Sequence, residues 1–244
     1  MILAVDTSSA LTSVAVTQGR EVLAEDAHLD ARRHAEVLAP LLEGVLRRAG
    51  AGQAQVEAVV CGVGPGPYTG LRVGIATAIA LGSAWRRPVY GLCSLDAIAA
   101  AVVSEGPATE FFVATDARRH EVYWARYAAD GERRAGPLVN RPDELDSVTR
   151  MLPWYGHGAL AHGSAFAHAL GAGNPALEYP QAGWLGRRAG ALLATGAEAA
   201  AGGAHLAAHG GDGAATADAL RGSVLLRPQP LYLRRPDATE PSLP

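Results

Sequence analysis

The feature that most constrains the fold is a pattern that occurs twice along the 244 residues: strands joined by tight turns, followed by helices that alternate with strands. The first occurrence opens with apolar, strand-like segments near residues 1–7, 11–18 and 21–28. The second opens with similar segments at 110–116 and 120–127. Such an order is typical of mixed sheets covered by helices. The sequence therefore predicts an α/β chain made of two duplicated βββαβα units.

Shifts in composition divide the chain further. A Gly-Pro turn at 106–107 separates a first subdomain, 1–104, from a second and degenerate subdomain, 105–200. Residues 201–222 are rich in Gly and Ala, and we expect a flexible insertion there. Residues 223–244 are expected to form a C-terminal strand and tail.

Two helices of the first subdomain have distinctive faces. Apolar residues recur at helical spacing over 31–48, although Pro40 lies inside this run. A second helix, over 70–85, carries small residues at steps of four: Gly70, Gly74, Ala78 and Gly82. Each glycine costs a helix about 1 kcal/mol relative to Ala. We therefore expect the stripe of small residues to offset this cost by close packing against another helix.

Composition excludes several kinds of chemistry. All 21 residues in the Lys and Arg total are Arg, so neither a P-loop lysine nor a Schiff-base lysine is available. A formal net charge of −3 argues against tight nucleic-acid binding by this chain alone. Cys61 and Cys93 lie in apolar segments and are expected to be buried free thiols. The first residues lack signal-peptide features and no long apolar run occurs, so we expect a cytoplasmic protein without a membrane span.

Two motifs suggest ligand chemistry but lack the residues that it needs. The glycine-rich loop at 62–70 precedes a helix, as a phosphate site would, yet it has neither a P-loop ending nor G-x-G-x-x-G spacing. We interpret it as a rigid turn, with direct anion contact as the alternative. His205 and His209 have helical metal-ligand spacing without an acidic neighbour. No metal site is therefore expected, and a metallopeptidase is the weakest functional alternative.

Asp6 and Asp116 each end the first strand of their unit. In actin-like ATPases, aspartates in these places face a nucleotide across the cleft between two subdomains, whereas the simpler interpretation is an Asx-turn. Thr7 and Ser8 leave room for a phosphate beside Asp6, but a basic pair at 118–119 stands where glycines would be needed. We therefore expect Asp6, Thr7, Ser8 and Asp116 to form a vestigial nucleotide cleft. An actin-like ATPase or small-molecule kinase using Asp6 and Asp116 remains the alternative function.

Five segments of the sequence resemble the bacterial TsaB (YeaZ) family of tRNA threonylcarbamoyladenosine biosynthesis. They are ILAVDTSSALTSVAV (2–16), RRHAEVLAPLLEGVL (32–46), GVGPGPYTGLRVGIATAIAL (62–81), TDARRHEVYWA (115–125) and PLYLR (230–234). The resemblance implies two actin-like (ribonuclease H-like) subdomains, each a mixed sheet with flanking helices. It also implies a non-catalytic scaffold for the paralogue TsaD, which forms N6-threonylcarbamoyladenosine at position 37 of tRNAs reading ANN codons. Ser94 and Ile98 stand where TsaD carries the two histidines of its metal motif.

The resemblance further implies how the chain associates. Family members pair through the two helices over 31–48 and 70–85, with TsaD in a heterodimer or with a second copy in a homodimer. TsaE is then a further member of the complex, tRNA is contacted only through the complex, and ATP or ADP belongs to the complex interface rather than to this chain. The helical faces suggest these interface residues: Leu38, Leu41, Leu42, Val45, Tyr68, Gly70, Leu71, Arg72, Gly74, Ile75 and Ala78. Leu41→Glu or Gly74→Arg is accordingly expected to abolish partner binding without unfolding the chain.

Overall fold

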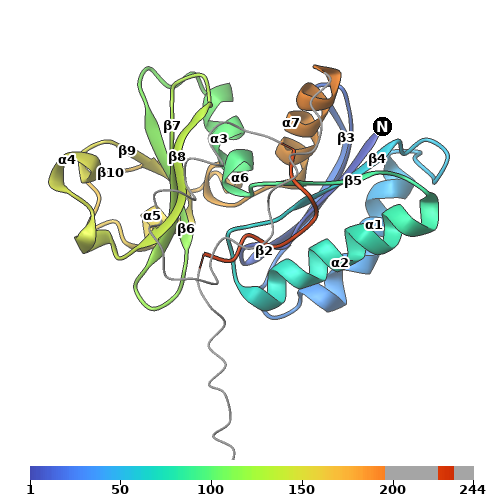
Figure 1. The fold of residues 1–244 in the computed structure, drawn as a ribbon, viewed down its shortest axis with the longest axis horizontal. Coiled ribbons are helices and arrows are strands. Elements are labelled where there is room, and N and C mark those ends of the chain that lie inside the picture. The colour runs from blue at the N-terminus through green and yellow to red at the C-terminus, as the bar shows by residue number, and fades with distance from the viewer. Residues whose placement is uncertain (196–224, 234–244) are drawn as a thin grey trace, which may run out of the picture.

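The computed structural model describes residues 1–195 and 225–233. It confirms the predicted α/β class, since two five-stranded mixed sheets each carry flanking helices (Figure 1). The expected insertion at 201–222, with His205 and His209, lies outside the described residues, as does most of the tail. Among the residues described, no helix is long and apolar enough to span a membrane.

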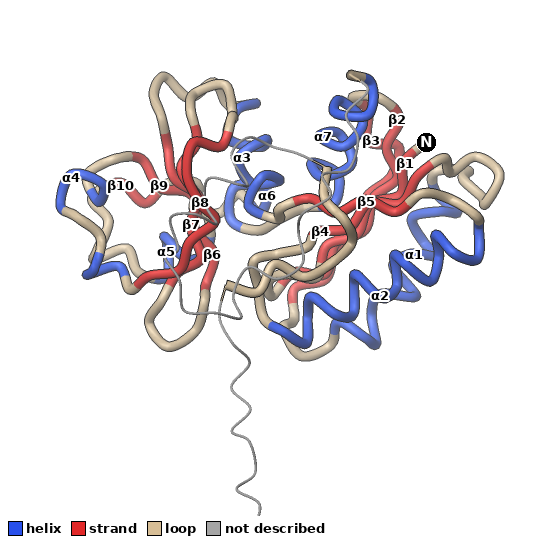
Figure 2. The backbone as a smooth tube through the Cα atoms, viewed as in Figure 1, coloured by secondary structure: helices blue, strands red, loops and turns tan. Residues whose placement is uncertain are grey.

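The first sheet has the strand order β3-β2-β1-β4-β5. Its antiparallel half consists of β1 (Ile2–Asp6), β2 (Leu11–Gln18) and β3 (Glu21–Leu29). Its parallel half adds β4 (Ala58–Gly62) beside β1 and then β5 (Val89–Leu92). Helices α1 (His34–Arg48) and α2 (Tyr68–Trp85) cover one face, and α7 (Ala182–Ala194) covers the other (Figures 1 and 2).

Both faces of this sheet are therefore covered, which explains why β1 is apolar at successive positions. Leu3 and Val5 point to the α1 and α2 side, whereas Ile2 and Ala4 join the core on the α7 side. All residues of β1 are buried. Alternate side chains of a strand point to opposite faces, so a sheet with two covered faces needs apolar residues on both.

The second sheet has the strand order β10-β9-β6-β7-β8. Its strands are β6 (Phe111–Asp116), β7 (Val122–Tyr127), β8 (Arg133–Asn140), β9 (Pro153–Tyr155) and β10 (His168–Ala169). Its short helices are η1 (Pro142–Glu144), α4 (Ser147–Arg150), α5 (His157–Ala161) and α6 (Pro175–Glu178). An aromatic cluster on one face, in which Trp154 stacks on Phe112 at 4.5 Å between ring centroids, forms its core.

The last helix of each predicted subdomain packs against the other subdomain. Helix α7 falls within the predicted second subdomain, 105–200, but its first turn bonds to the first sheet: the Ala182 amide donates to Ser13 Oγ (2.9 Å) and the Gly183 amide to Glu25 Oε1 (2.8 Å). Conversely, α3 (Leu95–Ser104) lies between the sheets and packs against β6, α6 and α7 (Figure 1). Chain order and packing therefore divide the molecule differently.

Several predicted boundaries shift in the structure. Helix α1 begins at His34 rather than near residue 31, because the Asp30 carboxylate accepts the Arg32 amide and forms a turn there. The C-terminal strand predicted within residues 223–244 does not form over the part that the structure describes, residues 225–233. This part, here called the C-terminal segment, has no regular secondary structure apart from one antiparallel bridge between Leu226 and Gly91.

Candidate functional site

Asp6 occupies the carboxyl end of β1 and opens the Asp6 loop, residues 6–9. Its side chain is wholly buried. The amide and the hydroxyl of Ser8 both donate to Oδ1, at 2.8 and 2.7 Å, and the hydroxyl of Ser94 donates to Oδ2 at 2.7 Å. Both carboxylate oxygens are thus held by donors of the protein itself.

The burial of Asp6 has an electrostatic consequence. Removal from water raises the pKa of Asp6 to about 6, although the hydrogen bonds from Ser8 and Ser94 oppose this rise by favouring the charged form. Desolvation therefore outweighs the hydrogen bonds at this carboxyl group. The carboxyl group of Asp6 therefore gains a proton in mildly acidic solution.

The glycine-rich loop between β4 and α2 packs directly on the Asp6 loop. The hydroxyl of Thr7 donates to the Gly70 carbonyl oxygen at 2.7 Å and accepts the Gly74 amide at 3.0 Å. The carbonyl group of Ser8 lies against Gly66, where a methyl group would collide with it. Thr7 and Ser8 of this chain therefore lie beside the N-terminus of α2, where a phosphate-binding protein would bind its ligand.

Asp116 lies at the equivalent end of β6 in the second sheet. Its Oδ1 accepts the amide of Arg118 at 3.0 Å, so it forms the Asx-turn that was the simpler interpretation. Arg118, Arg119 and His120 all have positive φ angles, of 62°, 54° and 59°. Each of the two aspartates is therefore bonded to its own turn, and the second turn adopts the left-handed conformation with non-glycine residues.

Ser94 and Ile98, which stand where TsaD carries the histidines of its metal motif, contact other residues of this chain. Ser94 Oγ accepts the Gly64 amide at 3.1 Å while donating to Asp6, and thereby ties three segments of the first subdomain together. Ile98 is wholly buried in the apolar core. Within the described parts of the chain, no group of three or more His, Cys, Asp or Glu residues is placed to hold a metal ion.

Most residues predicted to face a partner pack inside the chain instead. The buried ones are Leu38, Leu42, Val45, Gly70, Leu71, Gly74, Ile75 and Ala78. The reason is that α1 and α2 must cover the sheet, and their most apolar sides do so. The stripe of small residues admits the Asp6 loop rather than a partner helix, because added methyl groups at Gly70 and Gly74 would meet Thr7. Gly74→Arg is therefore expected to disrupt the fold.

The side of α1 and α2 that points away from the sheet is here called the outer face. Its residues are mostly not those predicted to contact a partner. Tyr68 and Arg72, which are among the predicted interface residues, are exposed on it, and Leu41 is partly buried. Ile79 on α2 also belongs to it, with 45% of its surface exposed. Other exposed residues of the two helices include the charged Glu36, Glu43 and Arg47 of α1, together with Ala39 and Pro40 on α1 and Ala76 and Ala80 on α2. Individually these small residues give no sequence signal.

The C-terminal segment completes one end of the outer face. The ring of Tyr232 stacks on that of Tyr68 at 5.1 Å between centroids, and the Arg72 guanidinium lies 4.0 Å above the Tyr68 ring. The Leu231 amide donates to the Val63 carbonyl oxygen at 2.8 Å, which fixes the segment beside the glycine-rich loop. Sequence reasoning missed Tyr232, since nothing local connects it with a helix so far away in the chain.

Comparison with known proteins agrees with the predicted resemblance. A family model described as TsaD, tRNA N6-adenosine threonylcarbamoyltransferase, matches residues 21–201. An uncharacterised protein of Mycobacterium tuberculosis is 43% identical over 168 residues, which cover 68% of this chain and 75% of that protein. The tRNA threonylcarbamoyladenosine biosynthesis protein TsaB of Escherichia coli is 34% identical over 131 residues, which cover 53% of this chain and 55% of TsaB. An uncharacterised protein of Mycobacterium leprae is 45% identical over 155 residues, 62% of this chain and 42% of its own length.

Solved structures give the same result over more of the chain. YeaZ from Pseudomonas aeruginosa superposes with a TM-score of 0.67 at 31% identity, covering 80% of this chain and 92% of YeaZ. A second structure, of a protein described as similar to peptidase YeaZ from the same organism, has a TM-score of 0.69 at 30% identity, covering 96% and 99%. The expected actin-like pair of subdomains is thereby confirmed.

Proposed function

The chain belongs to the TsaB (YeaZ) family, and from this premise we propose that it is a non-catalytic, cytoplasmic subunit in the synthesis of N6-threonylcarbamoyladenosine in tRNA. It supports TsaD, which modifies position 37 of tRNAs reading ANN codons. TsaE belongs to the same complex, and tRNA is reached through that complex. In the absence of TsaD, a second copy of the chain takes its place.

The observation that carries the non-catalytic role is the engagement of Asp6. In an actin-like ATPase this carboxylate would serve the nucleotide and its metal ion, but here Ser8 and Ser94 satisfy both of its oxygens. Thr7 is likewise bonded to α2. These groups hold the first subdomain together, and we therefore place ATP or ADP, where it acts, at the interface of the complex.

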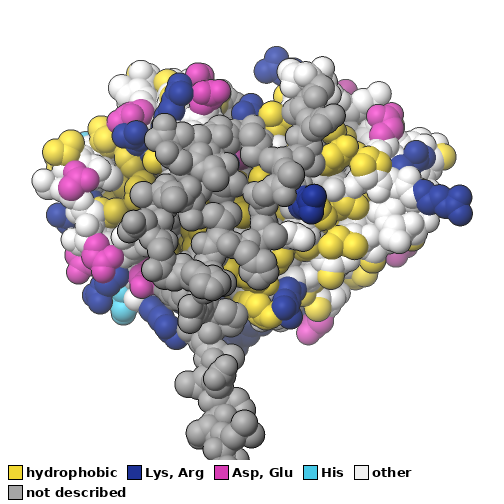
Figure 3. Space-filling view, in the orientation of Figure 1, with side chains coloured by type: hydrophobic (Ala, Val, Ile, Leu, Met, Phe, Trp, Pro, Cys, Tyr) yellow, Lys and Arg dark blue, Asp and Glu magenta, His cyan; other side chains and the backbone are white. Residues whose placement is uncertain are grey.

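The outer face supports the choice of a protein partner. Figure 3 shows apolar side chains along the region of α2, and Ile79 and Tyr68 are its large exposed hydrophobic residues. The small neighbours Ala76 and Ala80 let a partner helix approach closely. Arg72 and Tyr68 at one end have the chemistry of interface anchors. The proposed docking surface for TsaD, or for a second copy, is therefore this face and not the buried stripe.

The test is to mix the purified chain with TsaD from the same organism and measure masses by size exclusion with light scattering. We expect a heterodimer, with no ATP hydrolysis by the chain alone. Ile79→Glu should lose the heterodimer while its melting temperature stays unchanged, because the charge would be buried in the complex but not in the free chain.

Val148→Glu is the matched control, since Val148 is an exposed apolar residue, 72% accessible, on α4 of the other subdomain. It should bind TsaD as the unmodified chain does. Absence of any heterodimer, together with ATP hydrolysis that Asp6→Asn abolishes, would reverse the proposal in favour of an ATPase. Equal loss of binding in both variants would refute the outer face as the docking surface.

A further inference from the structure

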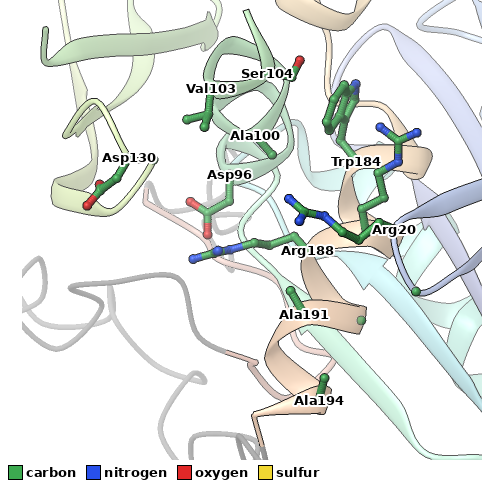
Figure 4. A pocket seen from close by; sticks show the side chains of 14 residues that line it. Arg20, Asp96, Ala100, Val103, Ser104, Asp130, Trp184, Arg188, Ala191 and Ala194 are labelled. Atoms are coloured by element: carbon green, nitrogen blue, oxygen red, sulfur yellow. The ribbon is translucent and has the colours of Figure 1, made fainter. Parts of the chain in front are cut away.

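A pocket of about 760 Å³ lies between α3 and α7, away from the Asp6 loop (Figure 4). Two turns complete its walls, the β2–β3 turn with Gly19 and Arg20 and the β7–β8 turn with Asp130 and Gly131. Strand β2 runs from the Asp6 loop at one end to Gly19 at the other. The pocket is thus a separate site at the opposite end of the first sheet, and its volume is in the range of small-molecule sites.

Asp96 on α3 lines this pocket and is only 2% exposed. Its Oδ1 accepts the hydroxyl of Tyr127 at 2.8 Å and lies 3.6 Å from Arg133 Nε. Its Oδ2 is buried and has no hydrogen-bond partner among the described residues. A buried carboxylate oxygen without a donor costs free energy, so a ligand that supplies a donor here is favoured.

The facing wall carries the opposite charge. Arg188 extends from α7 towards the same part of the pocket as Asp96, and Arg20 lies at its rim (Figure 4). Neither Arg20 nor Arg188 forms an ion pair within the described parts of the chain. Arg187 is held 4.7 Å above the Trp184 ring. Guanidinium groups are well suited to carboxylates, which they bind in a bidentate manner.

We propose that this pocket binds a small zwitterion of the α-amino acid type. The ligand's ammonium group donates to Asp96 Oδ2, and its carboxylate is held by Arg188. Its side chain lies against the apolar lining of Ala100, Val103 and Ala191. A simple anion would meet the carboxylate of Asp96, and a simple cation would meet Arg188, so a ligand with both charges fits best. This inference does not rest on the proposed function.

The test uses the full-length chain and the individual L-α-amino acids at millimolar concentration, first by thermal shift and then by calorimetry. At least one amino acid is expected to raise the melting temperature, because a ligand that binds only the folded state stabilises it. The analogues of that amino acid that lack the amino group or the carboxyl group should bind about tenfold more weakly or worse. The absence of a response to any amino acid, or binding of both analogues as tightly as the amino acid itself, would refute the proposal.

Two variants localise the binding. Arg188→Gln is expected to weaken it about tenfold by removing the charge that holds the carboxylate. Ala100→Leu is expected to weaken it by placing a larger side chain on the apolar wall that the ligand's side chain would contact. Arg47→Gln, the same change at an exposed position on α1, should bind normally. Unchanged affinity in both pocket variants would place the ligand elsewhere and overturn the assignment.

Asp96→Asn is unsuitable for this purpose, because it would leave the buried Arg133 without its counter-ion. Breaking one side of a buried ion pair typically costs about 3–5 kcal/mol of stability. Loss of binding in that variant would therefore report the fold rather than the ligand contact.

Discussion

At the scale of single residues, Asp6 illustrates how a carboxyl group in an ATPase-like position becomes a structural one. Its two oxygens organise the Asp6 loop through Ser8 and tie that loop to the start of α3 through Ser94. Burial is nevertheless unfavourable to its charge, and the pKa of Asp6 rises to about 6. The residue therefore specifies the geometry of the loop while reducing the stability of the charged form of the protein.

This conflict predicts a pH dependence of stability. Because the pKa of Asp6 is about 6 in the folded chain against 3.8 in the reference state, the folded chain binds more protons between these values. The free energy of unfolding should therefore fall as the pH rises from about 4 to about 6, by about 3 kcal/mol in total from this group. The test is to measure the free energy of unfolding in urea, across this pH range, for the unmodified chain and for Asp6→Asn. The difference between the two pH dependences is the contribution of Asp6.

Asp143→Asn provides the comparison, since Asp143 is an exposed carboxylate at the start of η1. It should keep the pH dependence of the unmodified chain. An Asp6→Asn variant with the same slope as the unmodified chain would show that the Asp6 carboxyl stays charged throughout this range.

At the scale of elements, α2 shows that one helix serves two contacts with different residues. Its inner side, with Gly70 and Gly74, fits against Thr7 of the Asp6 loop. Its outward side, with Ile79, is exposed and belongs to the proposed docking surface. The glycines lower the intrinsic stability of the helix, and the close contact with the loop offsets this cost.

Substitution of helical glycines separates the two effects. Gly74→Ala should lower the free energy of unfolding by about 2 kcal/mol, because its methyl group would overlap with Thr7 in a packed interior. Gly44→Ala, in α1 beside the flexible end of Arg48, should raise it by up to about 1 kcal/mol through helix propensity alone. Urea denaturation of both variants checks this, and stabilisation by Gly74→Ala would contradict the contact with Thr7.

At the scale of the whole molecule, segments distant in sequence join the two subdomains. Helices α3 and α7 lie between the sheets and line a common pocket (Figure 4). The C-terminal segment returns to the first subdomain, where Leu225, Leu226 and Leu231 are buried. The first subdomain is therefore complete only with residues from the last part of the chain.

The return of the C-terminal segment can be tested by its contribution to stability. Leu226, 1% exposed, packs in the main core and pairs with Gly91, so Leu226→Ala should cost about 3 kcal/mol. Leu170→Ala, at a residue 39% exposed, should change stability by about 0.5 kcal/mol or less. Similar small effects of both substitutions in thermal unfolding would mean that the segment does not contribute to the core.

The elements and their order could be predicted from the sequence. Periods of two and of 3.6 residues placed β1, β2, α1 and α2 within a few positions, and the turn after Asp6 followed from its neighbours. These features depend on contacts between residues close together in the chain, so a single sequence contains the information. The family likewise followed from short segments that include the glycine-rich loop.

Which residues each surface contacts could not be predicted from the sequence, because this depends on packing in three dimensions. A stripe of small residues permits any close approach, and the presence of Thr7 beside Gly74 rather than a partner helix is a matter of three-dimensional packing. The same holds for α7 on the first sheet, for Tyr232 on Tyr68 and for Asp96 facing Arg188. Helical spacing shows which residues share one side of a helix, but it does not show which part of the protein packs against that side.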